Sequence, residues 1–219
     1  MPKKTAARRP APEREQSRQD ILSAATRLFA ERGVENVGFG DIAKAARLSR
    51  PLVYFYFPDM QSLSLAAINV ANTELHQRFR EAAQPALSGL DQIVAIGRAY
   101  VRFALEEPAL FQGVARHDAK SGAKSQEHPV QQENDREFGG MIDVMVAALT
   151  KGVRDGTIRP DLGDPGKVAI SLWGLTHGVL QLHATKQTVI GQKLGTDFAD
   201  LPEFGLGLIR RMLEIRPKK

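Results

Sequence analysis

Apolar residues recur at the spacing of one helix face along most of the chain, with polar residues between them. Between residues 13 and 32 this face is followed directly by Gly33, a residue that commonly ends helices. The face consists of Ile21, Leu22, Ala25, Leu28 and Phe29. No segment shows the β-rich alternation of a half-buried strand, and no internal repeat is present. The pattern therefore predicts an all-α fold.

Residues 39–57 predict two short helices separated by a tight turn at Arg47. Ser49 is placed to cap the second helix, because its hydroxyl can accept a backbone N–H of the first turn. Pro51 falls in that first turn, where its missing N–H costs little, and Pro58 disfavours helix beyond residue 57. A short second helix fits a DNA major groove. Spacing alone leaves open a buried helical hairpin without a partner.

The rest of the chain also has helical periodicity. Further helices are predicted at residues 60–84, from residue 108 onward, and at 90–106, 129–155, 166–186 and 202–216. Polar connections are predicted at 117–128 and 156–165, and Gly139-Gly140 is expected to weaken its helix. The helix at 60–84 would be about 35 Å long, enough to join a small unit to a larger one.

Composition and charge narrow the class of protein. The 219 residues are 42% hydrophobic and 25% charged, as in ordinary soluble proteins, and no apolar run approaches the roughly 20 residues that span a bilayer. Zero cysteines exclude disulfides, thiolate metal sites and thiol nucleophiles, and fit a reducing cytoplasm. Glycine-rich phosphate loops, paired-histidine metal motifs and nucleophile elbows are missing, so we expect no enzyme, no metal and no cofactor.

Positive charge is concentrated near the N-terminus. Residues 1–62 contain 11 Lys+Arg against 7 Asp+Glu, whereas residues 63–219 contain 19 against 18. This excess is expected where a protein faces phosphates. Residues 1–12, rich in proline and basic residues, predict a disordered arm, which either reaches into a minor groove or remains a solvated tail.

In order along the chain, these residues resemble the TetR family of bacterial transcriptional regulators. The resemblance is carried by Arg18-x-x-Ile21-Leu22-x-Ala24-Ala25, Phe29-x-Glu31-x-Gly33, Asp41-Ile42-Ala43, Ala46-x-Leu48-Ser49, Tyr54-x-Tyr56-Phe57-Pro58 and Leu63. A looser similarity to a C-terminal domain of such regulators covers residues 152–182. It includes Asp155-Gly156-Thr157-Ile158-Arg159-Pro160 and Leu172-Trp173-x-x-x-His177-Gly178.

The resemblance implies a three-helix DNA-binding domain at residues 13–59 and a ligand-binding and dimerisation domain at residues 60–219. It further implies a cytoplasmic homodimer that binds a palindromic operator in double-stranded DNA, represses transcription and is released by a small-molecule effector. Such release requires an effector that binds the non-DNA state more tightly. The alternative is a constitutive DNA-binding regulator with no effector.

The resemblance also assigns DNA contacts residue by residue. Arg50 is the first candidate for base readout, since a guanidinium can bond guanine O6 and N7 together, and a phosphate contact is its alternative. Tyr54 and Tyr56 match positions that bond phosphates, whereas Val53 and Phe57 are expected in the core. The implied DNA-binding residues are Phe39, Gly40, Lys44, Ser49, Arg50, Pro51, Leu52, Tyr54 and Tyr56.

Four residues depart from the family pattern, at three places in the chain. Val37 and Gly38 replace the usual hydroxyl cap, which Asp41 in the first turn is expected to offset through the helix dipole. Arg47 stands where glycine is common, and would cost about 1–2 kcal/mol if the position needs positive φ. Met60 replaces a phosphate-binding lysine, so that contact is not carried over.

The predicted C-terminal domain has candidates for a pocket and an interface. A hydrophobic or aromatic effector would be bound by Phe103, Phe111, Met141, Met145, Trp173, His177 and Leu180. Ordinary core packing is the alternative for each apolar member, and an internally bonded histidine is the alternative for His177. A dimer interface is implied at Gly174, Gly178, Phe204, Leu208, Ile209 and Met212. Packing of this stripe within one chain is its alternative.

Overall fold

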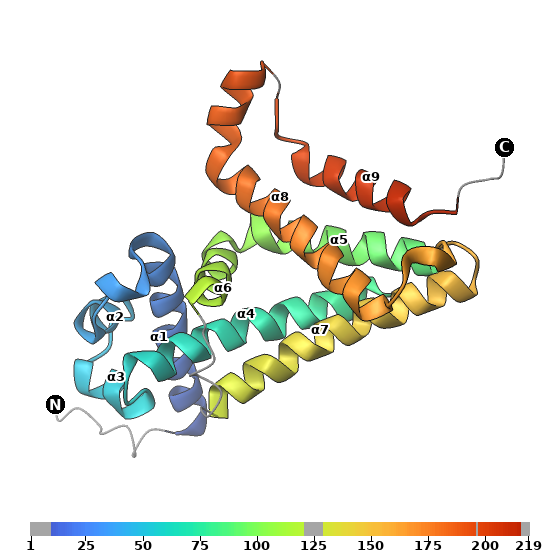
Figure 1. Cartoon of the computed structure of the whole chain (residues 1–219). Coiled ribbons are helices and arrows are strands. Elements are labelled where there is room, and N and C mark those ends of the chain that lie inside the picture. The colour runs from blue at the N-terminus through green and yellow to red at the C-terminus, as the bar shows by residue number, and fades with distance from the viewer. Residues whose placement is uncertain (1–9, 121–128, 196, 216–219) are drawn as a thin grey trace. The chain divides into compact units, whose positions relative to one another are not determined.

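The computed structural model describes residues 10–120, 129–195 and 197–215, and these are almost entirely helical (Figure 1). The helices are α1 (Ala11–Arg32), α2 (Phe39–Ala45), α3 (Arg50–Tyr56), α4 (Met60–Ala82), α5 (Gly89–Glu106), α6 (Pro108–Lys120), α7 (Pro129–Arg154), α8 (Pro165–Leu194) and α9 (Leu201–Leu213). Within these described ranges, extended pairing is limited to a single bridge between Ile158 and Glu214. The all-α prediction is confirmed.

Several helix ends differ from the sequence predictions. α1 begins at Ala11, inside the predicted arm, while residues 1–9 of that arm lie outside the described residues. α6 continues to Lys120 although a loop was predicted from residue 117, and the remainder of that loop is not described. α8 runs eight residues beyond the predicted end, to Leu194, where Gly195 takes the left-handed conformation (φ 63°). α9 ends at Leu213 rather than 216.

The expected weakness at Gly139-Gly140 does not interrupt α7. Gly140 lies directly against the imidazole of His76 on α4, and a Cβ added at Gly140 would come within 2.3 Å of that ring. The His76 Nδ1 lies 2.7 Å from the Glu137 Oε2 of α7. Gly140 therefore permits a close approach of α4 and α7, and the contact between His76 and Glu137 joins the two helices at the same place.

The chain forms two compact units. The first unit comprises Met1–Thr73 and Glu107–Arg136, and the second comprises Glu74–Glu106 and Glu137–Lys219. α4 and α7 each contribute residues to both units.

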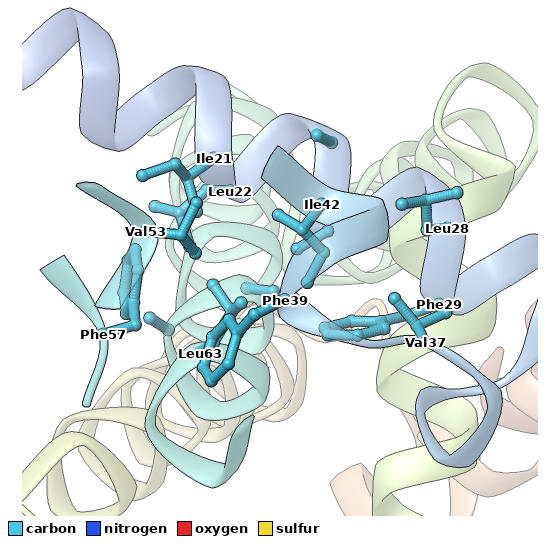
Figure 2. Packing of buried hydrophobic residues seen from close by; sticks show 14 of the residues in the cluster. Ile21, Leu22, Leu28, Phe29, Val37, Phe39, Ile42, Val53, Phe57 and Leu63 are labelled. Atoms are coloured by element: carbon cyan, nitrogen blue, oxygen red, sulfur yellow. The ribbon is translucent and has the colours of Figure 1, made fainter. Parts of the chain in front are cut away.

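The core of the first unit is formed by α1, α2, α3 and the start of α4 (Figure 2). Ile21, Ile42, Val53 and Leu63 are completely buried there. Burying such a side chain contributes about 1.5–3 kcal/mol relative to exposure, so this cluster fixes how α2 and α3 lie against α1. α6 packs against α1 in the same unit.

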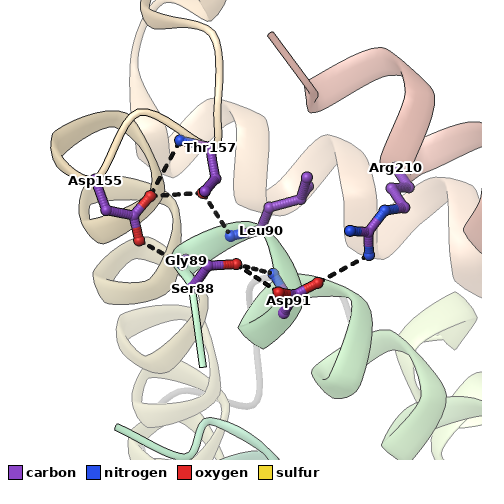
Figure 3. A network of polar contacts seen from close by, with 7 residues as sticks. All are labelled: Ser88, Gly89, Leu90, Asp91, Asp155, Thr157 and Arg210. Atoms are coloured by element: carbon purple, nitrogen blue, oxygen red, sulfur yellow. Dashed lines mark hydrogen bonds and ion pairs between the residues drawn. The ribbon is translucent and has the colours of Figure 1, made fainter. Parts of the chain in front are cut away.

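In the second unit, the connection between α7 and α8 caps the N-terminus of α5 (Figure 3). The Gly89 N–H donates to Asp155 Oδ2 (2.8 Å), and the Leu90 N–H donates to Thr157 Oγ1 (3.2 Å). The Thr157 hydroxyl donates to Asp155 Oδ1 (2.6 Å). Because the first N–H groups of a helix lack intrahelical acceptors, these side chains satisfy donors that would otherwise remain unpaired.

A second contact in this network joins α5 to α9. Arg210 Nη1 donates to Asp91 Oδ1 at 2.9 Å, and the Ser88 hydroxyl donates to Asp91 Oδ2 at 2.7 Å. The Ser88 hydrogen bond and then the Arg210 contact hold the pKa of Asp91 below its ordinary value. Hydrogen bonds from Thr157 and then Gly89 lower the pKa of Asp155 in the same way. Both carboxylates are thus stabilised in their charged form.

Candidate DNA-binding surface and effector pocket

The turn between α2 and α3 uses the conformation anticipated for a glycine. Arg47 has φ 56°, and among the residues that the structure describes it is the non-glycine residue with positive φ. The Leu48 N–H donates to the Ala43 carbonyl at 2.9 Å, which closes the turn. The prediction that Arg47 stands at a strained position is confirmed.

The N-termini of α2 and α3 are capped differently from each other. The Gly38 N–H donates to Asp41 Oδ2 at 2.9 Å, the capping-box bond from the N-cap residue back to the third residue of the helix, and the Asp41 charge also lies at the helix N-terminus. Ser49 occupies the N-cap position of α3, but its side chain makes no capping hydrogen bond, which corrects the prediction. Its carbonyl instead accepts the N–H groups of Leu52 and Val53. Pro51 lies in the first turn of α3 as predicted.

Most of the predicted DNA-contacting residues are exposed. They are Gly40 and Lys44 on α2, Ser49 at the turn, and Arg50, Pro51 and Tyr54 on α3. With Arg47 they provide three exposed basic side chains on these two short helices and their turn. A positive surface of this kind suits a phosphate backbone.

Three of the predicted contact residues are placed differently. Leu52 is 7% exposed and Phe39 is 9% exposed, so both pack mainly inside the first unit and offer little surface to a base or a phosphate. The Tyr56 hydroxyl is buried without a hydrogen-bonding partner, which does not support a phosphate contact from this conformation. Val53 and Phe57 are buried, as predicted.

Phe55 was missed by the sequence reasoning. It is 56% exposed on α3, and its ring meets Tyr56 edge-on at 5.3 Å. Its position in a run of four aromatic residues gave no indication of which of them would face outward.

The second unit contains a small cavity of about 20 Å³, close to the space taken by one water molecule. Of the predicted pocket residues it brings together Met145 and Trp173, joined by residues not predicted, Phe79, Tyr100 and Thr176 among them. Phe103, Met141 and Leu180 are buried but do not line it, and Phe111 belongs to the first unit. No ionisable carboxylate or ammonium group is among the lining residues.

His177 is part of an aromatic cluster beside this cavity. Its Nδ1 lies 2.7 Å from the Tyr100 hydroxyl, and its ring stacks on Tyr100 with an interplanar angle of 22°. The Trp173 ring is 5.4 Å away, and Phe138 meets Trp173 edge-on. The alternative of an internally bonded histidine therefore fits His177 as the structure describes it.

The predicted interface residues separate into two groups. Phe204, Leu208 and Met212 on α9 are 40–56% exposed, whereas Ile209 is 3% exposed and lines the cavity. Placing Ile209 at an interface was therefore wrong, because this face of α9 packs inside its own unit. A Cβ added at Gly174 or Gly178 would meet no atom within 4 Å in the described parts of the chain.

Two other kinds of site are missing from the described residues. None of their helices has the length and apolar character that crossing a bilayer requires. The same residues contain no cluster of three or more His, Asp or Glu side chains arranged to hold a metal ion.

Family models match both parts of the chain. The model described as "Bacterial regulatory proteins, tetR family" matches residues 21–67. The model "Tetracyclin repressor-like, C-terminal domain" matches residues 93–204, just over half of the 219 residues. The chain belongs to the TetR family of transcriptional regulators.

Individual relatives agree with this assignment. The HTH-type transcriptional regulator AcrR of Shigella flexneri is 36% identical over 93 residues, which are 40% of this chain and 43% of AcrR. The match thus spans less than half of that relative's length.

Two solved structures share the fold at low sequence identity. A putative transcriptional regulator from Saccharomonospora viridis in complex with choline has a TM-score of 0.72 at 18% identity, covering 92% of this chain and 100% of that one. FadR from Bacillus subtilis in complex with stearoyl-CoA has a TM-score of 0.69 at 16% identity, covering 89% and 98%.

Proposed function

We propose that this regulator is a homodimeric repressor that binds a palindromic operator through α3 and is released by a small-molecule effector. The observation that carries the proposal is the exposed surface of α2 and α3, where Lys44, Arg47 and Arg50 lie around a short helix of major-groove size. Membership of the TetR family supports the same function.

Base readout is assigned to Arg50, and contacts to the DNA backbone are assigned to Lys44, Ser49 and Tyr54. A bidentate arginine–guanine contact is worth about 1–3 kcal/mol of discrimination against a wrong base. We therefore expect Arg50→Ala to lose preference for DNA that the wild type selects from a random pool, while keeping salt-sensitive affinity for other DNA. A lysine contact to phosphate carries no sequence information, so Lys44→Ala should weaken binding to both DNAs by a similar factor. If Arg50→Ala selects the same sequence as strongly as the wild type, the assignment fails.

The homodimer is proposed to form through α8 and α9. Large apolar side chains are exposed on both helices: Ile170, Leu175, Leu182, Val189, Phe204, Leu208 and Met212. Gly174 and Gly178 leave open space on α8, which lets a helix of a second copy approach closely. Two-fold symmetry is also what two operator half-sites about one helical turn apart require.

The effector is proposed to be an uncharged, apolar or aromatic compound, because the cavity is lined by aromatic and aliphatic side chains. Trp173 is the one tryptophan of the chain and lines this cavity, so its fluorescence should report binding. Uncharged aromatic compounds should change the Trp173 emission and release DNA at the same concentrations, whereas cationic and anionic compounds of equal size should do neither.

The second candidate is a constitutive regulator, and the volume of about 20 Å³ favours it, because little more than a water fits. If the regulator is constitutive, none of the uncharged, cationic or anionic compounds tested should both change the Trp173 emission and release the DNA. A compound that does both would exclude a constitutive regulator.

A further inference from the structure

Arg50 and Tyr54 form a pair on the exposed surface of α3. Arg50 Nη2 donates to the Tyr54 hydroxyl at 3.2 Å, and the guanidinium carbon lies 5.6 Å from the centre of the Tyr54 ring. The spacing of four residues places both side chains on one helix face. The Tyr54 ring in turn packs against Phe39 of α2, with 4.4 Å between the ring centres.

This arrangement restrains Arg50 from two directions. The aromatic face attracts the cation, and the hydroxyl accepts one of its N–H groups. Phe39 is 9% exposed, so the ring beneath the guanidinium rests on a buried residue of the core. An arginine side chain has many rotamers, and restraint before binding reduces the entropy lost when it meets a base.

The Tyr54 hydroxyl can still donate a hydrogen bond while it accepts one from Arg50. A phenol oxygen accepts hydrogen bonds and also donates one, so accepting from Arg50 leaves its own proton to be donated. The guanidinium likewise keeps N–H groups for guanine O6 and N7 after one is used by the hydroxyl.

We propose that Tyr54 is a positioning residue for sequence readout: its hydroxyl donates to a phosphate oxygen while accepting from Arg50, so that one backbone contact fixes the arginine that reads the base. This inference rests on the proposed DNA-binding function. It differs from a simple phosphate contact, because a phosphate contact alone sets affinity and register but does not change discrimination between bases.

The test uses Tyr54→Phe, which removes the hydroxyl and keeps the ring that packs on Phe39. The DNA is the sequence selected by the wild type from a random pool, and a second copy changed at the base pair where Arg50→Ala loses most discrimination. We expect Tyr54→Phe to reduce discrimination between these two DNAs about two- to fivefold, the size usual for an exposed pair of side chains. Affinity for both DNAs should also fall because the phosphate hydrogen bond is lost, but the salt dependence should stay the same, since a neutral hydroxyl displaces no counterion.

Tyr56→Phe is the matched control. It removes the hydroxyl of a neighbouring tyrosine, which is buried and has no hydrogen-bonding partner, so discrimination should not change. Helix content measured by circular dichroism should be the same in both variants. In an Arg50→Ala background, Tyr54→Phe should no longer affect discrimination, although the fall in affinity should persist.

Failure of the proposed DNA-binding function and failure of the positioning role of Tyr54 give different results. If the wild type selects no sequence, or Arg50→Ala loses discrimination at no base pair, the proposed function or its readout residue is wrong. If selection and the Arg50 effect are present but Tyr54→Phe weakens both DNAs by one common factor, Tyr54 contacts phosphate only and the positioning role is overturned. An equal effect of Tyr54→Phe with and without Arg50 also overturns it.

Discussion

Arg47→Gly should stabilise this protein, although it removes a side chain. Arg47 has φ 56° in the turn between α2 and α3, a region that costs a non-glycine residue about 1–2 kcal/mol. Glycine adopts this conformation freely but loses about 0.5–1 kcal/mol more conformational entropy on folding. The difference predicts a net gain of about 0.5–1 kcal/mol in the first unit.

Hydrogen exchange of the backbone amides measures this gain where it arises. Peptides covering α2 and α3 should exchange about two- to fivefold more slowly in Arg47→Gly, since about 1.4 kcal/mol corresponds to a factor of ten. The measurement is made without DNA, because loss of an exposed positive charge is expected to weaken DNA binding in any case. Peptides from the second unit provide an internal reference.

Ala46→Gly is the matched control. Ala46 precedes Arg47 and has φ −78°, an ordinary helical value. Glycine gains nothing there and should speed exchange of the same peptides by a similar factor. If Arg47→Gly also speeds exchange, or if Arg47→Ala slows it equally, left-handed strain at this position is not the cause.

Three further predictions concern the second unit and the assembly. Gly178→Leu should weaken dimerisation measured by analytical ultracentrifugation. Gly139→Leu also places a side chain in open space but lies on α7, so it should leave dimerisation unchanged. If both variants form the same dimer as the wild type, α8 is not part of the interface. Gly89→Ala should destabilise the second unit by about 3 kcal/mol or more, because the added Cβ would lie 2.0 Å from the Gly152 nitrogen. Thermal unfolding followed by Trp173 emission measures this loss. A small change would mean that the two backbones separate easily. Asp155→Asn should be less stable than the wild type at pH 7. Because folding lowers the pKa of Asp155, its contribution is lost as the pH falls through that value, so the two proteins should converge below about pH 4, and a constant gap would contradict this.

The sequence was sufficient for the fold because its helix signals are local. The strain at Arg47 could be anticipated from the family resemblance, because glycine is common at this turn position in the family. The end of α8 was predicted at residue 186, whereas the helix passes Gly191 and ends at Gly195, which adopts the left-handed conformation. A helix can continue past one glycine and end at the next, so its last turn cannot be chosen from glycine positions alone.

Exposure within a helix was harder to predict than the helix itself. Leu208 and Ile209 are adjacent on α9, yet one is 40% exposed and the other 3%. Apolar residues cover more than one face of this helix, so its sequence does not say which face meets α5 and α8. On α3 the family resemblance placed Leu52 at the DNA, although its side chain is buried, and the run of four aromatic residues did not reveal that Phe55 is exposed.

The size of the cavity bears on how release from DNA would work. A volume of about 20 Å³ is too small for an aromatic compound, so an effector that uses this cavity would need its lining side chains to move apart. That requirement is the condition for regulation, since a ligand shifts an equilibrium only by its difference in affinity between two states. A pocket equally open in both states would bind effector without that difference. In the proposed mechanism the cost of separating Trp173 from Tyr100 and its neighbours therefore lowers the affinity for the effector and at the same time couples its binding to the release of DNA.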